Sequence, residues 1–274
     1  EHPCVWADPR SVESLPHLGG LGGEAVGING MGAIVGTSEL PDRASHAVVW
    51  SAILELTDIG AGYGYISGGR AIDDAGDVAG WVGVHPTERG QDHFRPAVWS
   101  ASQVWVGSDL GGRWGEGVAM GRDGVVIGFA HDGRQASGWL RHRGGAPEPI
   151  ATPGCASFWP LGITDDETVV GMCIGADFAR RAIAIDAGGA MRPLDLARGA
   201  ELTAISARGD VAGRIPDETG VTIPWVRRQG DPRPLLLPRL RDHHHSVFGM
   251  RGARLLVGVA TADYCSHALL WRAP

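Results

Sequence analysis

Residues 27–38 read Gly-Ile-Asn-Gly-Met-Gly-Ala-Ile-Val-Gly-Thr-Ser, and this stretch contains the pattern that decides the fold. An apolar residue, Ile28, is followed eight positions later by Gly36, with two aliphatic residues directly before that glycine. A polar, glycine-containing segment lies between them. The pattern predicts two short strands joined by a tight hairpin, because glycine tolerates the positive φ that such turns require.

The same spacing occurs six times along the chain. The pairs are Ile28–Gly36, Ile72–Gly80, Met120–Gly128, Ile163–Gly171, Ile205–Gly213 and Met250–Gly258. Successive apolar residues of these pairs lie 44, 48, 43, 42 and 45 residues apart. A repeat of this length matches the roughly 40–45 residues of a four-stranded propeller blade.

Each unit continues with a third strand and a short fourth strand. Residues 46–50, 96–99 and 267–271 are third strands that end on tryptophan, whereas Trp139 and Trp225 stand elsewhere and the fourth unit has no tryptophan. Glu167 and Arg254 replace the turn glycine of the other units, so these two turns are expected to differ. Short strands between turn signals, with no long 3.6-residue apolar period, predict an all-β protein with almost no helix.

The fold class that follows is an all-β, single β-propeller domain over residues 1–274, with six four-stranded blades. The sixth unit ends after its third strand, and residues 12–15 supply one more strand at the other end. Residues 1–20 are therefore expected to complete the last blade and close the ring, which removes exposed sheet edges. Residues 2–6 look like a further third strand, so seven blades is the alternative.

The run at residues 27–38, followed by His46-Ala47 and Trp50, resembles the HAF repeat, which is named for a His-Ala-Phe triplet. Only the first and sixth units keep His-Ala, and valine or leucine stands in place of the phenylalanine. The resemblance covers nearly the whole chain. It implies a propeller-like fold and an extracellular bacterial protein, and it implies no particular activity.

The charge balance and the cysteines indicate which partners and which cellular compartment to expect. The chain has 24 basic residues, all arginine, against 31 acidic ones, which gives a net charge of −7. This balance offers no basic footprint for nucleic acid and no polybasic membrane patch, and we expect a monomer. The first residue is Glu1 rather than methionine, as in a secreted chain after removal of its signal peptide or in a trimmed one.

Four cysteines permit two disulfides in an oxidising compartment, and four free thiols are the alternative. Cys155 and Cys173 should lie at the same end of one blade. Cys4 and Cys265 lie in the segments that would close the ring. Both pairs are geometrically possible.

The position four residues before each apolar repeat residue should lie at the rim of the central channel. We call these six positions the rim positions: Glu24, Gly68, Glu116, Trp159, Glu201 and Ser246. Three glutamates in alternate units could share a proton, act as a general acid, or bind Ca²⁺ or another divalent cation. Alternatively, each glutamate pairs with an arginine such as Arg70 or faces solvent.

Loops that lead to the same rim contain histidine and aromatic residues. The candidates for a base are His243 and His245; the candidates for ligand contact are His244, Arg70, Tyr63, Tyr65, Trp114 and Trp159. Flat aromatic faces suit sugars and other rings, although such residues also anchor loops. The three histidines could instead be solvated or bind a metal. The long loop over residues 81–95 could cover the channel mouth or be a plain surface loop.

Three functions from different classes fit these features. The first is a secreted propeller that binds a small molecule, glycan or peptide at the channel mouth. The second is a propeller enzyme, a lyase, hydrolase or cyclase, with a rim glutamate as the acid and a histidine as the base. The third is a structural or surface-interaction protein. No nucleophile elbow, P-loop, HExxH or EF-hand motif occurs.

Overall fold

The chain is all-β, as the sequence predicts. The computed structural model describes all residues except 1, 9, 85–92, 108–111, 241–242, 263–264 and 274, together with the side chains of all described residues but 7, 84 and 265. Within these residues the helices are two short 3-10 turns, η1 (Arg122–Gly124) and η2 (Gly252–Arg254). No helix among them has the length and apolar character needed to cross a membrane.

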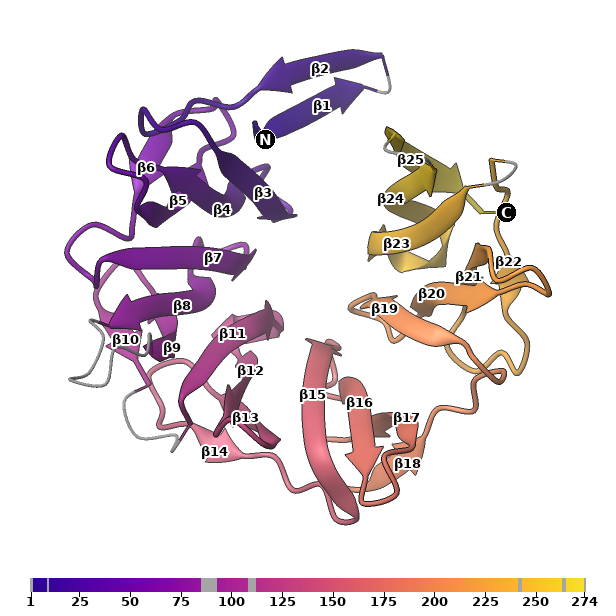
Figure 1. Ribbon diagram of the computed structural model, residues 1–274. Coiled ribbons are helices and arrows are strands. Elements are labelled where there is room, and N and C mark those ends of the chain that lie inside the picture. The colour runs from indigo at the N-terminus through magenta and orange to yellow at the C-terminus, as the bar shows by residue number, and fades with distance from the viewer. Residues whose placement is uncertain are drawn as a thin grey trace. The chain divides into compact units, whose positions relative to one another are not determined.

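The structure consists of two units, residues 1–160 and 161–274, and each is described by itself. In unit 1 the first repeat forms an antiparallel sheet (Figure 1) of β3 (Gly23–Ile28), β4 (Ile34–Glu39), β5 (Ser45–Trp50) and β6 (Leu56–Asp58). The second repeat forms β7 (Ile66–Ile72), β8 (Val78–Val84), β9 (His93–Trp99) and β10 (Val104–Val106), and the third forms β11 (Trp114–Met120), β12 (Val126–His131), β13 (Ala136–Arg141) and β14 (Glu148–Pro149). A parallel bridge between Trp114 and Phe94 joins the second and third sets of strands.

The remaining repeats form three more sheets, again in sequence order. They are β15 (Cys155–Ile163), β16 (Val169–Gly175), β17 (Arg180–Ile185) and β18 (Met191–Pro193); then β19 (Glu201–Ile205), β20 (Val211–Pro216), β21 (Thr222–Arg227) and β22 (Leu235–Leu236); and last β23 (His244–Arg251), β24 (Leu255–Ala262) and β25 (Cys265–Arg272). The predicted third strands of the first, second and sixth repeats correspond to β5, β9 and β25.

The N-terminal segment forms a small sheet of its own. β1 (Cys4–Asp8) pairs antiparallel with β2 (Ser11–Ser14), and the last sheet has three strands. Leu15 then packs beside Trp50 in a buried cluster of unit 1. The sheets are not closed, so the expected completion of the last sheet by residues 12–15 is not observed. Residues 11–14 instead form a local hairpin with the segment just before them, and among the described residues neither strand of this hairpin pairs with the last sheet. The local hairpin closes a short loop and therefore costs less chain entropy than pairing with a strand far along the sequence.

The glycine that ends each repeat pattern lies against a bulge in the first strand. In five repeats the first strand shifts register by one residue opposite this glycine. A Cβ placed on Gly36 would lie 1.8 Å from the carbonyl oxygen of Glu24, and one on Gly80 would lie 2.0 Å from that of Gly68. Since a real Cβ cannot approach so closely, the bulge explains why glycine recurs at this position.

Side-chain oxygens stabilise the hairpin turns. The residue after the apolar repeat residue accepts a backbone N–H from four positions later at Asn29, Asp73, Thr164 and Ser206. The turn glycines Gly32, Gly76 and Gly209 have positive φ, and Glu167 adopts the same region at φ 60°. The expectation of a different turn at Glu167 is therefore wrong, whereas the sixth repeat does differ and places its positive φ at Gly252.

One large apolar side chain of the third strand fills the core of most sheets. Trp50 and Trp271 are buried, and each donates its indole N–H to a proline carbonyl, that of Pro16 or Pro238, at 2.7 Å. Trp139 and Trp225 are also buried but stand two residues earlier in their strands, opposite Gly128 and Gly213. The absence of a side chain on these glycines makes room for the shifted indole rings.

Cys155 and Cys173 form a disulfide. This pairing confirms the expectation for the fourth repeat, and it indicates a location outside the reducing cytoplasm. Cys4 is a free, partly buried thiol, contrary to the expected bond with Cys265, whose side chain lies outside the described part of the chain.

Replacement of Gly36 by alanine tests the role of the bulge. The new Cβ would meet the backbone of Glu24, which no rotamer change can relieve, so Gly36→Ala should lower the free energy of unfolding by about 3 kcal/mol. Gly188→Ala is the matched control, because its nearest neighbour is the flexible Asp186 side chain at 3.3 Å. Chemical denaturation of both variants measures the difference, and equal stabilities would contradict the assignment.

Candidate functional site

Four aromatic side chains meet at the rim end of β11 and β12 in unit 1. We call Trp114, Phe129, His131 and Trp159 the aromatic cluster. The ring centroids of Trp114 lie 5.0 Å from Phe129, 4.9 Å from His131 and 5.7 Å from Trp159. Phe129 is 4% exposed, whereas Trp114 is 36% exposed. The cluster therefore presents an indole to solvent on a rigid aromatic base.

His131 gives the aromatic cluster a polar edge. Its Nδ1 accepts the backbone N–H of Gly133 at 2.9 Å, so Nε2 carries the proton of the neutral ring and can donate it to a ligand. The next residue, Asp132, accepts backbone N–H groups from Gln135 and Arg134. The hydrogen bond from Gln135 is the main cause that lowers the pKa of Asp132. The N–H donor of His131 is thus followed directly in the sequence by the carboxylate of Asp132, next to the aromatic cluster.

Glu116 lies next to the aromatic cluster and is held by Arg70. Glu116 pairs with Phe129 across β11 and β12, and its Oε2 accepts the Arg70 Nε–H at 3.0 Å. The arginine comes from the preceding repeat, on β7. Glu24 is exposed on β3 and has no polar side-chain contact among the described residues. The rim of unit 1 therefore contains one paired and one solvated glutamate.

In unit 2 a single arginine joins two rim positions. Arg214 Nε donates to Glu201 Oε2 at 2.7 Å, and its Nη1 donates to Ser246 Oγ at 3.0 Å. Together with the Arg70–Glu116 pair, this shows that two of the three rim glutamates accept from an arginine. Within the described residues no group of three or more His, Cys, Asp or Glu side chains is placed to hold a metal ion.

The three consecutive histidines have different environments. His245 is 1% exposed; its Nε2 accepts the Leu240 N–H at 3.0 Å, and its Nδ1 lies 3.3 Å from the carbonyl of Thr222. Burial is the main cause that lowers the pKa of His245. His244 is exposed and accepts from the Thr222 N–H, while the ring of His243 lies 5.5 Å from that of His267. His245 thus connects backbone groups and has no surface open to a ligand.

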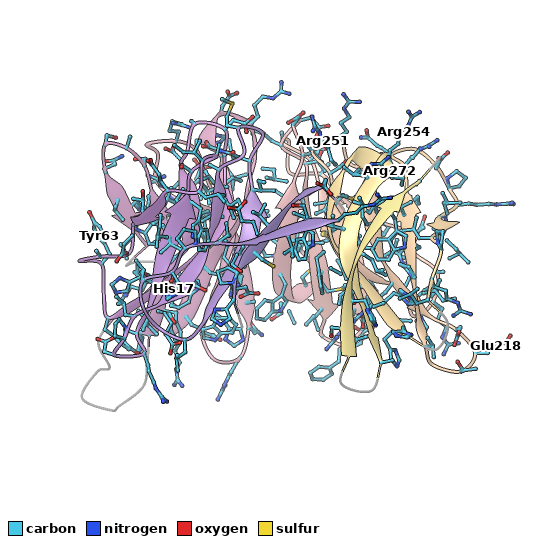
Figure 2. All side chains as sticks on the ribbon, turned by 90° about the horizontal axis from the view of Figure 1, so that it is seen from above. His17, Tyr63, Glu218, Arg251, Arg254 and Arg272 are labelled. Atoms are coloured by element: carbon cyan, nitrogen blue, oxygen red, sulfur yellow. The ribbon has the colours of Figure 1, made fainter. Side chains whose placement is uncertain are left out.

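The two loop tyrosines come from the segment that leads into β7. Tyr63 is 42% exposed and lies at the margin of unit 1 in Figure 2, and Tyr65 is half-buried just before β7. Most of the long loop over residues 81–95 lies outside the described residues. Of the candidate ligand contacts, the structure brings together Trp114 and Trp159, with the Arg70–Glu116 pair beside them.

Sequence reasoning did not single out His131 or Arg214. Both would follow from the register of the hairpins, because His131 is the partner of Trp114 and Arg214 is the partner of Glu201. In the hairpins of five repeats the residue directly after the repeat glycine pairs with the rim position, as Arg214 does with Glu201, and His131 lies two residues beyond that position, opposite Trp114. This spacing is visible in the sequence once the bulge is known.

The buried position of His245 makes the stability of the fold depend on pH. Since its folded-state pKa lies below the ordinary 6.5, the unfolded chain binds a proton first as the pH falls. The free energy of unfolding should drop by up to about 1.4 kcal/mol per pH unit below 6.5, until the folded-state pKa is reached. His245→Gln should remove this part of the slope in chemical denaturation, and the exposed His244→Gln should keep it. The same slope in both variants would refute this role.

No protein-family model matches the chain, and no curated protein matches its sequence. Solved structures share its fold. The chain is similar to a prolyl endopeptidase with a TM-score of 0.65 and 11% identity, over 95% of this chain and 44% of that one. It is similar to a streptogramin B lyase with a TM-score of 0.55 and 14% identity, over 91% and 78% of the two chains.

A third similar structure is AofleA from Arthrobotrys oligospora, with a TM-score of 0.51 and 10% identity, over 90% of this chain and 82% of that one. The chain thus spans less than half of the endopeptidase and most of the other two. At these identities the likeness concerns the fold alone. The structural neighbours are propeller proteins, so this chain has an all-β architecture of the propeller kind.

Proposed function

We propose that this chain is a secreted six-bladed β-propeller that binds a glycan, or another small molecule with a ring, at the mouth of its central channel. The observation that carries the proposal is the aromatic cluster, in which a partly exposed Trp114 lies on Phe129 and Trp159 with His131 at its edge. An indole face stacks on the apolar face of a sugar ring, and the His131 Nε2–H and the Asp132 carboxylate suit its hydroxyl groups.

The count of six blades is supported by the six repeats, each of which forms its own set of strands. Secretion is supported by the Cys155–Cys173 disulfide, since such bonds persist in oxidising compartments.

Two observations favour binding over acid–base catalysis. The Glu116 and Glu201 carboxylates are each engaged in an ion pair with an arginine side chain through Oε2. His245, one of the two candidate bases, is buried with both ring nitrogens facing backbone groups. Stacking of a ligand ring on the aromatic cluster requires neither a general acid nor a general base.

Sugar titrations of Trp114→Ala test the proposal. The unaltered chain should show saturable quenching of tryptophan fluorescence with at least one member of a panel of neutral mono- and oligosaccharides. Loss of the stacking face should weaken that binding by about 1–2 kcal/mol, or roughly 5- to 30-fold.

Trp6→Ala is the matched control, because Trp6 is 51% exposed and lies on β1, outside the aromatic cluster. Its affinity should equal that of the unaltered chain. Equal losses in both variants, or no saturable response to any sugar in the panel, would refute the proposed function.

A further inference from the structure

At the opposite end of β12 from the aromatic cluster, Arg141 occupies a position that belongs to tryptophan in other repeats. Arg141 pairs with Val126, the first residue of its second strand. The equivalent pairs in the first two repeats are Ile34 with Trp50 and Val78 with Trp99. An arginine thus stands in the core position of the third strand, and it is only 5% exposed.

Arg141 has no hydrogen bond and no ion pair with any described residue. Its Nε is enclosed and unpartnered, and the guanidinium carbon lies 4.9 Å from the centroid of the Trp105 ring. A cation–π contact offsets only part of the cost of removing a charge from water. Burial is the main cause that lowers the pKa of Arg141, and the charge of Asp77 opposes this effect.

The two nearest carboxylates are already engaged by another arginine. Arg143 donates from Nη1 to Asp77 at 3.0 Å and from Nη2 to Asp73 at 2.9 Å. Asp77 is 6% exposed, and burial is the main cause that raises its pKa, against the opposing effect of Arg143. The two arginines balance the two aspartates in charge, and the Asp77 carboxylate also stabilises the Arg141 charge at a distance, but Arg141 has no direct hydrogen-bond partner among these groups.

Arg141 lines a cavity of about 330 Å³, in the size range of small-molecule pockets. Arg143 and Asp77 line it on one side, and Trp105 with the turn residues Ser102 and Gln103 lines it on another. The exposed arginines Arg251, Arg254 and Arg272, near one end of the last sheet in Figure 2, differ because water solvates their charges. An enclosed, unpaired guanidinium on a cavity wall is an arrangement that an anionic ligand completes.

We propose that this cavity is a binding site for a small organic monocarboxylate, whose two oxygens accept from the Arg141 guanidinium while its apolar part lies against Trp105. A planar carboxylate matches the fork of a guanidinium and can accept from the N–H groups that have no partner in the protein. A dianion such as phosphate is disfavoured by the carboxylates of Asp73 and Asp77 nearby. The site is separate from the aromatic cluster and does not depend on sugar binding.

Calorimetric titration with sodium acetate, butyrate and hexanoate tests the site, with sodium chloride and sodium phosphate at matched ionic strength as comparisons. Butyrate and hexanoate should bind several-fold more tightly than acetate, because their methylene groups are buried in the cavity. Arg141→Gln should weaken binding at least ten-fold. Tighter binding of phosphate than of butyrate, or no binding of any carboxylate, would overturn the proposal.

The fifth repeat supplies a matched control. Arg227 holds the equivalent position, paired with Val211, but its Nη1 donates to the carbonyl of Asp195 at 2.7 Å. Arg227→Gln should therefore leave carboxylate binding unchanged. An equal loss of affinity in Arg141→Gln and Arg227→Gln would assign the effect to general destabilisation and overturn the site.

Variants of Ser102 and a second variant of Arg141 test the site even if Arg141→Gln folds poorly. Ser102→Trp fills the cavity from an exposed lining position without changing its charge, so it should abolish binding, whereas Ser102→Ala should not. Arg141→Met should melt at or above the temperature of the unaltered chain without ligand, because it removes an unpaired buried charge. A large fall in melting temperature would mean that Arg141 stabilises the fold and would contradict a binding role.

Discussion

The close approach of one glycine to one carbonyl oxygen governs the first hairpin in five of the six repeats. A Cβ on Gly36, Gly80 or Gly213 would overlap the oxygen of the bulged first strand, so the second strand can lie there only without a side chain. The bulge fixes the register of the hairpin, and the register decides which residues meet at the rim. In these five hairpins the residue after the glycine pairs with the rim position, which is how Glu201 meets Arg214 and Glu116 meets Phe129.

The period of the repeats was sufficient to predict the strands, because turns and strands depend on residues close in sequence. The hairpin from Ile28 to Gly36 and the third strand ending at Trp50 follow from local patterns of this kind. Pairing of β1 with β2 could not be predicted, since residues 11–14 have the same alternation whichever partner they take. Glu167 could not be predicted either, because its left-handed conformation is imposed by the hairpin around it.

In the candidate sites, too, some residues can be recognised from the local sequence, and others only from the pairing of the strands. Trp114 and Trp159 stand out in the sequence as aromatic residues near glycine-rich loops, whereas His131 joins them only through its pairing with Trp114. Arg141 looks like an ordinary charged residue at the end of a strand. Its burial becomes visible only when the third strand is aligned through the glycine partner, which places it level with Trp50 and Trp99.

At the position of Arg141 the third repeat also lacks the side-chain hydrogen bond that the first and sixth repeats form there. In the first and sixth repeats the tryptophan at this position donates its indole N–H to a carbonyl oxygen, at Trp50 and Trp271. In the third repeat the tryptophan has moved to Trp139, its enclosed indole N–H has no partner, and the vacated position holds an unpaired cation. In the fifth repeat the tryptophan is shifted in the same way, but Arg227 donates a hydrogen bond to a backbone carbonyl. A fold that holds an enclosed guanidinium without hydrogen-bond partners on a cavity wall loses stability there, and such local losses are expected where a ligand supplies the missing contacts.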